Sequence, residues 1–199
     1  MTRIVLASQS PRRKKLLQQI GLAFEISPSD VEEISSHTEP GPMVEDLAAL
    51  KATDVASKFS DSFIIGSDTI VVHNGEVLGK PADADEAFSF LSRLSGTHHF
   101  VYTGVAFVKT DKNGTILAKH TFYEQTKVTF STLGEQEIKA YIKSGNPMDK
   151  AGSYGIQDDL GALFVEKIDG DYYNVVGFPL NRFYREIKSF FPEFDIMSS

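Results

Sequence analysis

The sequence contains no cysteine, fewer basic than acidic side chains, and no long apolar run. Without cysteine, the chain cannot form disulfide bonds or zinc–thiolate centres, and it cannot use a thiol nucleophile. No apolar stretch approaches the length of about 18 residues that a membrane-spanning helix needs. The apolar beginning of the chain ends at Ser8, which is too early for a secretory signal. We therefore expect a protein of the cytoplasm.

The charge balance is acidic. The 199 residues include 20 Lys and Arg against 27 Asp and Glu, which gives a formal net charge of −7. This balance argues against a protein that binds nucleic acid polymers independently of sequence, because such proteins place many cations against phosphates. A small polyphosphate needs only a local basic cluster and stays possible. The composition, with 41% hydrophobic and 24% charged residues, is typical of a globular protein, and the length predicts one domain over residues 1–199.

The spacing of apolar residues predicts strands and helices in a mixed order. Asn74-Gly75 between two apolar runs is a strong hairpin signal, and Thr132 with Glu135 has the spacing of a helical capping box. Because strand–helix units and hairpins both occur, we predict an α/β fold with a mixed twisted sheet flanked by helices. The expected strands cover residues 4–7, 24–26, 63–66, 70–72, 76–78, 98–109, 116–130, 162–168 and 172–176, and the expected helices cover residues 11–20, 43–59, 84–94, 132–145 and 179–190.

Arg12 and Arg13 occupy the first turn of the first predicted helix, which Ser10 would cap. Cations at this position oppose the helix dipole. The same helix start offers free backbone N–H groups, and Ser8 and Ser10 add hydroxyls, so the segment has the features of a phosphate cradle. It lacks the glycines of a Walker A loop. The alternative interpretation is that both arginines are solvated surface residues.

Two lysines stand out by their positions. Lys51 lies four residues from both Leu47 and Val55, so it borders the apolar face of the second helix. It either extends along that face to the solvent or reaches into a pocket. Lys80 precedes Pro81 between the hairpin and the third helix, where it could bring a point charge to a phosphate.

Acidic residues at the ends of two predicted strands complete the set. Asp68 follows the apolar run at residues 63–66, and the carboxyl ends of buried strands are where open α/β sheets bind ligands. The alternative is an ordinary Asx turn. Glu32 and Glu33 lie in the loop after the second strand and are either solvated or, if one faces Asp68, part of a Mg²⁺ site. Such cations and acids suit a polyphosphate with a divalent metal, in which a carboxylate orients or deprotonates the attacking water.

Several motifs follow one another along nearly the whole chain. They are Leu6-Ala7-Ser8-Gln9-Ser10-Pro11-Arg12-Arg13, Gly66-Ser67-Asp68-Thr69, Gly79-Lys80-Pro81, Met148-Asp149-Lys150-Ala151-Gly152 with Tyr154-Gly155-Ile156-Gln157, and Gly170-Asp171-Tyr172-Tyr173 through Gly177-Phe178-Pro179. In this order, they resemble the motifs of the Maf family of nucleoside triphosphate pyrophosphatases. The resemblance implies a two-lobed mixed α/β fold around a central cleft, similar to that of inosine triphosphate pyrophosphatases, and a homodimer.

The resemblance also implies a reaction. The enzyme would cleave a nucleoside triphosphate between the α and β phosphates, with Mg²⁺ or a similar ion such as Mn²⁺ or Co²⁺. Asp68 matches the family's proton acceptor and Glu33 matches an acid associated with metal binding and catalysis, so these two are the implied catalytic residues and metal ligands. The implied phosphate-binding residues are Ser8, Arg12, Arg13, Lys51 and Lys80.

The implied substrates are dTTP and UTP. Arg12, Thr69 and Gln157 match the specificity positions of the subfamily that acts on these two nucleotides. Gln157 carries both a donor and an acceptor, so it can pair with a pyrimidine edge. Two features depart from the family pattern: Ser67 stands where alanine is usual, and residues 157–161 form a longer and more acidic stretch.

We therefore expect a house-cleaning hydrolase of dTTP, UTP and modified pyrimidine triphosphates such as pseudo-UTP or 5-methyl-UTP. One alternative is the same reaction on 7-methyl-GTP or another purine analogue. A second is a nucleotide-binding regulator of septum formation and cell division. A third is an α/β domain whose cations are only surface residues.

Overall fold

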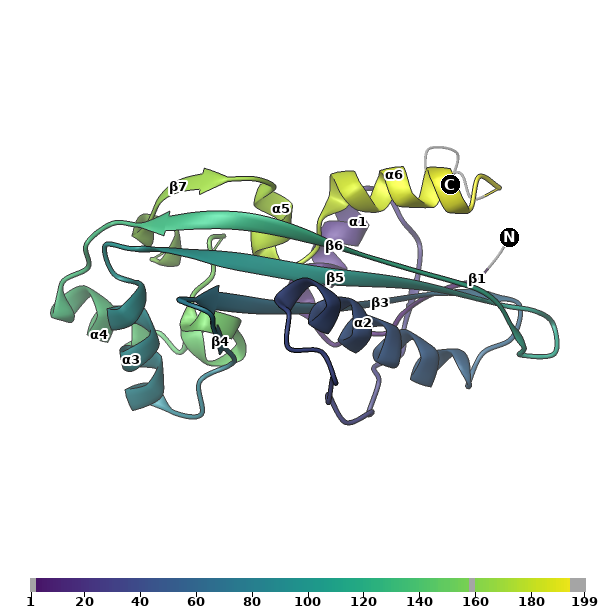
Figure 1. Ribbon diagram of the computed structural model, residues 1–199, viewed down its shortest axis with the longest axis horizontal. Coiled ribbons are helices and arrows are strands. Elements are labelled where there is room, and N and C mark those ends of the chain that lie inside the picture. Colours follow the sequence, from purple (N-terminus) through teal and green to yellow (C-terminus); the bar gives the residue numbers. More distant parts are fainter. Residues whose placement is uncertain (1–2, 158–159, 194–199) are drawn as a thin grey trace. The chain divides into compact units, whose positions relative to one another are not determined.

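The computed structural model describes residues 3–157 and 160–193. The chain folds into two compact units. Unit 1 comprises Met1–Asp68, Thr103–Glu124 and Gly177–Ser199, and unit 2 comprises Thr69–Tyr102 and Gln125–Val176. Figure 1 follows the chain through its elements from purple at the N-terminus to yellow at the C-terminus. The expectation of a single domain over residues 1–199 stays a prediction.

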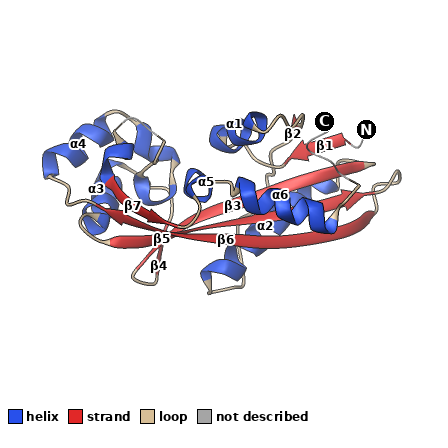
Figure 2. Ribbon diagram, turned by 90° about the horizontal axis from the view of Figure 1, so that it is seen from above, coloured by secondary structure: helices blue, strands red, loops and turns tan. Residues whose placement is uncertain are grey.

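Both units are built on strands of one mixed β-sheet. The strands are β1 (Arg3–Leu6), β2 (Glu25–Ile26), β3 (Ser62–His73), β4 (Glu76–Leu78), β5 (His98–Thr110), β6 (Ile116–Phe130) and β7 (Val165–Asp169). Their order is β2-β1-β3-β5-β6-β7, and β4 pairs with β3. β1 is parallel to β2 and β3, whereas β4 and β7 are antiparallel to β3 and β6. Figure 2 shows the long strands β3, β5 and β6 in red, side by side.

Helices accompany the sheet in both units, which confirms the predicted mixed α/β fold. The α-helices are α1 (Pro11–Gln19), α2 (Pro40–Ala56), α3 (Ala84–Leu94), α4 (Glu135–Lys143), α5 (Tyr172–Val176) and α6 (Leu180–Phe190), and short 3₁₀ helices cover Asn146–Asp149, Ala151–Ser153 and Gly161–Phe164. Within residues 3–157 and 160–193, no helix is both long and apolar enough to cross a membrane.

Local sequence signals correctly predicted the start of α1 and the turn between β3 and β4. Ser10 caps α1, since its Oγ accepts a hydrogen bond from the backbone N–H of Arg13, and Pro11 is the first helical residue. Asn74 and Gly75 have φ angles of 51° and 82°, the left-handed values that a two-residue type I′ hairpin turn requires. The hairpin prediction is therefore confirmed.

The prediction of a strand at residues 172–176 is wrong, because this segment forms α5. The Oδ1 of Asp171 accepts a hydrogen bond of 3.0 Å from the backbone N–H of Asn174, as a helix N-cap does. The polar residue before the apolar run therefore decides its conformation, against the preference of tyrosine and valine for strands.

Two further predicted elements begin later than expected. The predicted strand at residues 162–168 begins only at Val165, because Gly161–Phe164 is a 3₁₀ turn whose Leu163 is 72% exposed. The predicted capping box of Thr132 and Glu135 is also wrong. At the start of α4, the backbone N–H of Gly134 donates a hydrogen bond of 2.6 Å to the carboxylate of Glu137. Glycine therefore caps this helix without a side chain, and only the acid three residues later contributes a side-chain hydrogen bond.

The core of unit 1 lies on both faces of its strands. Val5 of β1, Ile64 of β3 and Ala106 of β5 belong to a cluster that includes buried alanines of α2 and its Val55. The neighbouring strand residues are Phe63 and Phe107. The ring of Phe107 contacts Phe183 of α6, and both rings contact Phe191. Because successive residues of a strand point to opposite faces, α2 covers one face of these strands and α6 covers the other.

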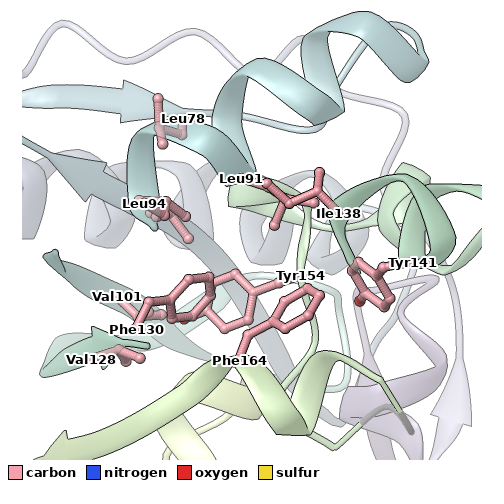
Figure 3. Close-up of a cluster of buried hydrophobic side chains, with 11 residues drawn as sticks. Leu78, Leu91, Leu94, Val101, Val128, Phe130, Ile138, Tyr141, Tyr154 and Phe164 are labelled. Atoms are coloured by element: carbon pink, nitrogen blue, oxygen red, sulfur yellow. The ribbon is translucent and has the colours of Figure 1, made fainter. Parts of the chain in front are cut away.

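Unit 2 has its own aromatic core, shown in Figure 3. Leucines of α3 pack there with residues of β5, β6 and α4. The rings of Phe130 and Tyr154 lie edge to face with their centroids 4.7 Å apart. The ring of His99 contacts Phe130 and Tyr154 of this cluster, and its Nε2 is 2.7 Å from the hydroxyl of Tyr154. Burial lowers the pKa of His99 to about 3, so this ring is neutral at physiological pH.

Two glycines let α2 approach the sheet closely. A Cβ atom on Gly66 of β3 would lie 2.3 Å from the carbonyl oxygen of Ala48, and one on Gly104 of β5 would lie 2.0 Å from that of Val44. Both distances are far below van der Waals contact, so only glycine fits. Gly66 and Asp68 lie two residues apart in β3, and therefore on the same face. The close approach of α2 thus brings this helix to the face that carries Asp68.

Gly104→Ala is expected to lower the free energy of unfolding by about 3 kcal/mol, because the added methyl group would overlap the backbone of α2. Urea unfolding followed by circular dichroism measures this change. Gly79→Ala is the matched control, since nothing lies within 4 Å of its Cβ position. Equal stability of the two variants would contradict the close packing of α2.

Candidate active site

Two carboxylates share one lysine in unit 1. The Nζ of Lys51 lies 2.7 Å from Oδ1 of Asp68 and 2.8 Å from Oε2 of Glu33. The side chains of Lys51 and Asp68 are 13% and 11% exposed, whereas that of Glu33 is 57% exposed. The fold therefore joins a helix, a strand and a loop at one ammonium group, and all three contributing residues were predicted site residues.

Asp68 does not lie at the end of a strand, as the sequence suggested. β3 runs without a break from Ser62 to His73, so Asp68 lies in its middle and the Asx-turn alternative is wrong as well. The apolar runs on either side are two halves of one strand. A carboxylate in a buried strand is costly unless it is paired, and Lys51 supplies the pairing charge. Lys51 therefore reaches into the fold and does not extend to solvent.

The start of α1 is the segment predicted as a phosphate cradle, and its side chains are held by hydrogen bonds. The hydroxyl of Ser8, which follows β1, accepts hydrogen bonds from the backbone N–H of Ser10 at 3.2 Å and from Nη1 of Arg13 at 3.1 Å. The Nε of Arg13 donates to the carbonyl of Gly177 at 3.0 Å. The guanidinium of Arg13 is thus fixed at two points, which excludes the interpretation of this residue as a solvated surface arginine.

The cradle and the carboxylate pair act on each other electrostatically. Burial lowers the pKa of Arg13, and the charge of its neighbour Arg12 lowers it further, while the carboxylates of Asp68 and Glu33 raise it. A guanidinium remains protonated under all these influences. Arg13 therefore places a permanent positive charge within electrostatic reach of both acids. Arg12 lies beside it in the first turn of α1, and this turn holds no acidic residue.

The remaining predicted residues belong to unit 2. Thr69 directly follows Asp68 in β3 and is half-buried, whereas Lys80 and Gln157 are exposed. The carbonyl of Gly79, next to Lys80, accepts a hydrogen bond of 3.1 Å from the N–H of Gly152. Two of the motifs found in the sequence are therefore side by side in this unit.

The segment that leads to Gln157 is anchored to the unit 2 core. Tyr154 contacts His99, and the N–H of Gly155 donates to the hydroxyl of Tyr141 at 3.1 Å. Gln157 follows this anchored segment directly. Asp158 and Asp159, which make the stretch after Gln157 acidic, lie outside the described residues. The roles assigned to Thr69, Lys80 and Gln157 stay predictions.

The residues that hold the loop carrying Glu33 were not predicted from the sequence. Ser29 and Ser35 donate side-chain hydrogen bonds to Asp54 and Asp46 of α2. These contacts join positions 25 and 11 residues apart, and no local motif signals them. Buried Lys150 was also missed as a structural residue, although it lies in a recognised motif. Its Nζ donates to the carbonyl of Asn146 and to the Asp149 carboxylate.

The donor set of the carboxylate pair fits a magnesium ion. Mg²⁺ is usually bound in nucleotide enzymes by one or two carboxylates together with water and substrate phosphates. Glu33 and Asp68 both approach a single cationic group, so their oxygens converge. The described part of the chain contains no group of three or more His, Cys, Asp or Glu side chains able to hold a metal ion.

Known proteins resemble this chain closely in sequence. The family model described as Maf-like protein matches residues 3–190. A dTTP/UTP pyrophosphatase of Bacillus cereus strain ZK / E33L is 51% identical over 191 residues, which cover 96% of this chain and 96% of that protein. A dTTP/UTP pyrophosphatase of Bacillus anthracis has the same identity and coverage.

Two solved structures resemble the fold more distantly. The Ham1 protein of Staphylococcus aureus has a TM-score of 0.46 and 16% identity, covering 64% of this chain and 71% of its own. A nucleoside-triphosphatase and dITP/XTP pyrophosphatase of Mycobacterium abscessus has a TM-score of 0.44 and 14% identity, covering 96% of this chain and 99% of its own.

Proposed function

Because the chain belongs to the Maf family, we propose that it is a nucleoside triphosphate pyrophosphatase that hydrolyses dTTP and UTP. Modified pyrimidine triphosphates such as pseudo-UTP and 5-methyl-UTP are included as substrates, consistent with a house-cleaning role. The products are the nucleoside monophosphate and pyrophosphate. The proposal is supported by the 51% identity to proteins named for this activity. A cytoplasmic location and a homodimer are further parts of the proposal.

The observation that carries the proposal is the ammonium of Lys51 between the carboxylates of Asp68 and Glu33. Mixed charges of this kind, with Arg13 in electrostatic reach, suit a polyanion whose reaction needs both charge neutralisation and a proton acceptor.

The reaction assigns a distinct task to each group. Ser8, Arg12, Arg13, Lys51 and Lys80 bind the triphosphate oxygens. Asp68 accepts a proton from the attacking water, whose oxygen forms a bond to one phosphorus of the α–β anhydride while the bridging P–O bond breaks. The cationic side chains offset the negative charge that develops as this bond breaks. When bound, Mg²⁺ (or Mn²⁺ or Co²⁺) neutralises phosphate charge and acidifies water, and Glu33 and Asp68 would hold it.

A nucleotide panel tests the proposal. Purified protein with Mg²⁺ is incubated separately with dTTP, UTP, CTP, ATP, GTP and 7-methyl-GTP, and released pyrophosphate is measured by an enzyme-coupled assay. We expect the highest kcat/KM with dTTP and UTP. Turnover of 7-methyl-GTP alone would favour the purine-analogue alternative. Nucleotide binding without turnover would favour a regulatory protein of septum formation.

Gln157→Ala is expected to change the ranking among the bases more than the rate on the best one. The amide of Gln157 offers a donor and an acceptor to a pyrimidine edge, and its loss removes discrimination of about 10-fold or more between UTP and CTP. The measurement is the ratio of kcat/KM for these two nucleotides. An unchanged ratio would show that the base is recognised elsewhere.

A further inference from the structure

Glu33 lies on a loop without regular secondary structure, between β2 and α2. Its side chain is more than half exposed, although its carboxylate contacts the nearly buried Nζ of Lys51. An ion pair with one exposed partner contributes little by itself, because it must restrict two long side chains and is screened by salt. Other contacts must therefore fix the carboxylate of Glu33 beside Lys51.

Two serine–aspartate hydrogen bonds flank this ion pair. The Oγ of Ser29 donates to Oδ2 of Asp54 at 2.8 Å, and the Oγ of Ser35 donates to Oδ2 of Asp46 at 2.7 Å. Along the loop Glu33 lies between the two serines, and along α2 Lys51 lies between the two aspartates. The loop therefore runs antiparallel to α2 and contacts it at three successive points.

Each serine also closes a turn of the loop itself. The hydroxyl of Ser29 accepts a hydrogen bond of 3.2 Å from the N–H of Val31, and that of Ser35 accepts one of 3.1 Å from the N–H of His37. A hydroxyl can donate and accept at once. Each serine side chain thus both shapes the loop and joins it to α2. Ser29 does so four residues before Glu33, and Ser35 does so two residues after it.

We infer that Ser29 and Ser35, with their acceptors Asp54 and Asp46, are positioning residues that hold the Glu33 carboxylate beside Lys51. This inference rests on the proposed function, in which Glu33 takes part in catalysis. None of the four residues contacts Asp68 in the described hydrogen bonds, so their effect on the reaction passes through Glu33. A purely structural role would instead show as a general loss of stability.

The test combines Ser35→Ala with Glu33→Gln. In the otherwise native protein, we expect Ser35→Ala to lower kcat for UTP by about 5- to 20-fold, as for the loss of one partly buried hydrogen bond to a charged group. In the Glu33→Gln background, Ser35→Ala should lower kcat by less than about 2-fold. The carboxylate that Ser35 positions is absent from that variant, so its position no longer matters. Ser35→Thr, which keeps the hydroxyl, should restore most of the activity. Ser36→Ala, at an exposed neighbouring serine, is the matched control.

Amide hydrogen exchange provides a readout that does not depend on turnover. In Ser35→Ala without nucleotide, amides of residues 31–37 should exchange about 10-fold faster or more, while those of β3 and β5 keep their protection. Equal losses of kcat in the two backgrounds, or unchanged exchange in the loop, would overturn the inference. Absence of pyrophosphate release by the native protein would instead refute the proposed function, and the exchange measurement would then decide alone whether Ser35 holds the loop.

Discussion

Asp68→Asn is expected to lower kcat for UTP hydrolysis by at least about 100-fold, the contribution typical of a general base. Asparagine has nearly the same shape, and its Oδ1 can still accept the hydrogen bond of 2.7 Å that Lys51 donates. The amide, however, cannot take a proton from water. The variant should therefore fold normally and fail in the chemical step.

Steady-state pyrophosphate release measures the loss, and thermal unfolding by circular dichroism checks the fold. Asp85→Asn is a suitable control, because Asp85 is an exposed acid of α3 in unit 2 and its loss should leave kcat within about 2-fold of the native value. Full activity of Asp68→Asn would remove Asp68 from the mechanism.

Lys51→Met should have a comparably large effect, with a second consequence for stability. The substitution keeps the length of the side chain but removes the ammonium that joins Asp68 and Glu33. We expect kcat/KM for UTP to fall by about 100-fold or more, because the proposed reaction uses this charge to bind the polyphosphate. The free energy of unfolding should fall by about 2 kcal/mol, because the nearly buried carboxyl group of Asp68 loses the partner that Lys51 provides.

The double variant Lys51→Met with Asp68→Asn separates the two consequences. Replacing Asp68 by a neutral residue removes the unpaired charge, so stability should recover by about 1 kcal/mol or more relative to Lys51→Met. Activity should remain lost. If stability stayed equally low, the cost of Lys51→Met would come from packing and not from the carboxylate that the lysine pairs with.

Local signals in the sequence predicted much of the framework. The cap at Ser10 and the Asn74-Gly75 turn depend on neighbouring residues only, and both were predicted correctly. The segment at residues 172–176 was predicted as a strand because its apolar residues suit one. The deciding contact is the side chain of Asp171, whose capping role competes with that preference.

The sequence indicated which residues belong to the candidate site, but not which of them contact one another. A motif indicated Asp68, helical spacing indicated Lys51 and the position after the second strand indicated Glu33, yet their contact depends on how closely α2 packs on the sheet. That distance is set by Gly66 and Gly104, where no side chain fits. The hydrogen bonds of Ser29 and Ser35 to α2 form between residues far apart in the chain, so periodicity and motif spacing give no indication of them.

The position of the bond that breaks is the most direct test of the account. ³¹P NMR of UTP incubated with the native protein and Mg²⁺ distinguishes the two possible pairs of products. Cleavage of the α–β anhydride predicts resonances of UMP and pyrophosphate growing in equal amounts, and both should be absent over the same time with Asp68→Asn. Resonances of UDP and orthophosphate from the native protein would contradict the proposed reaction.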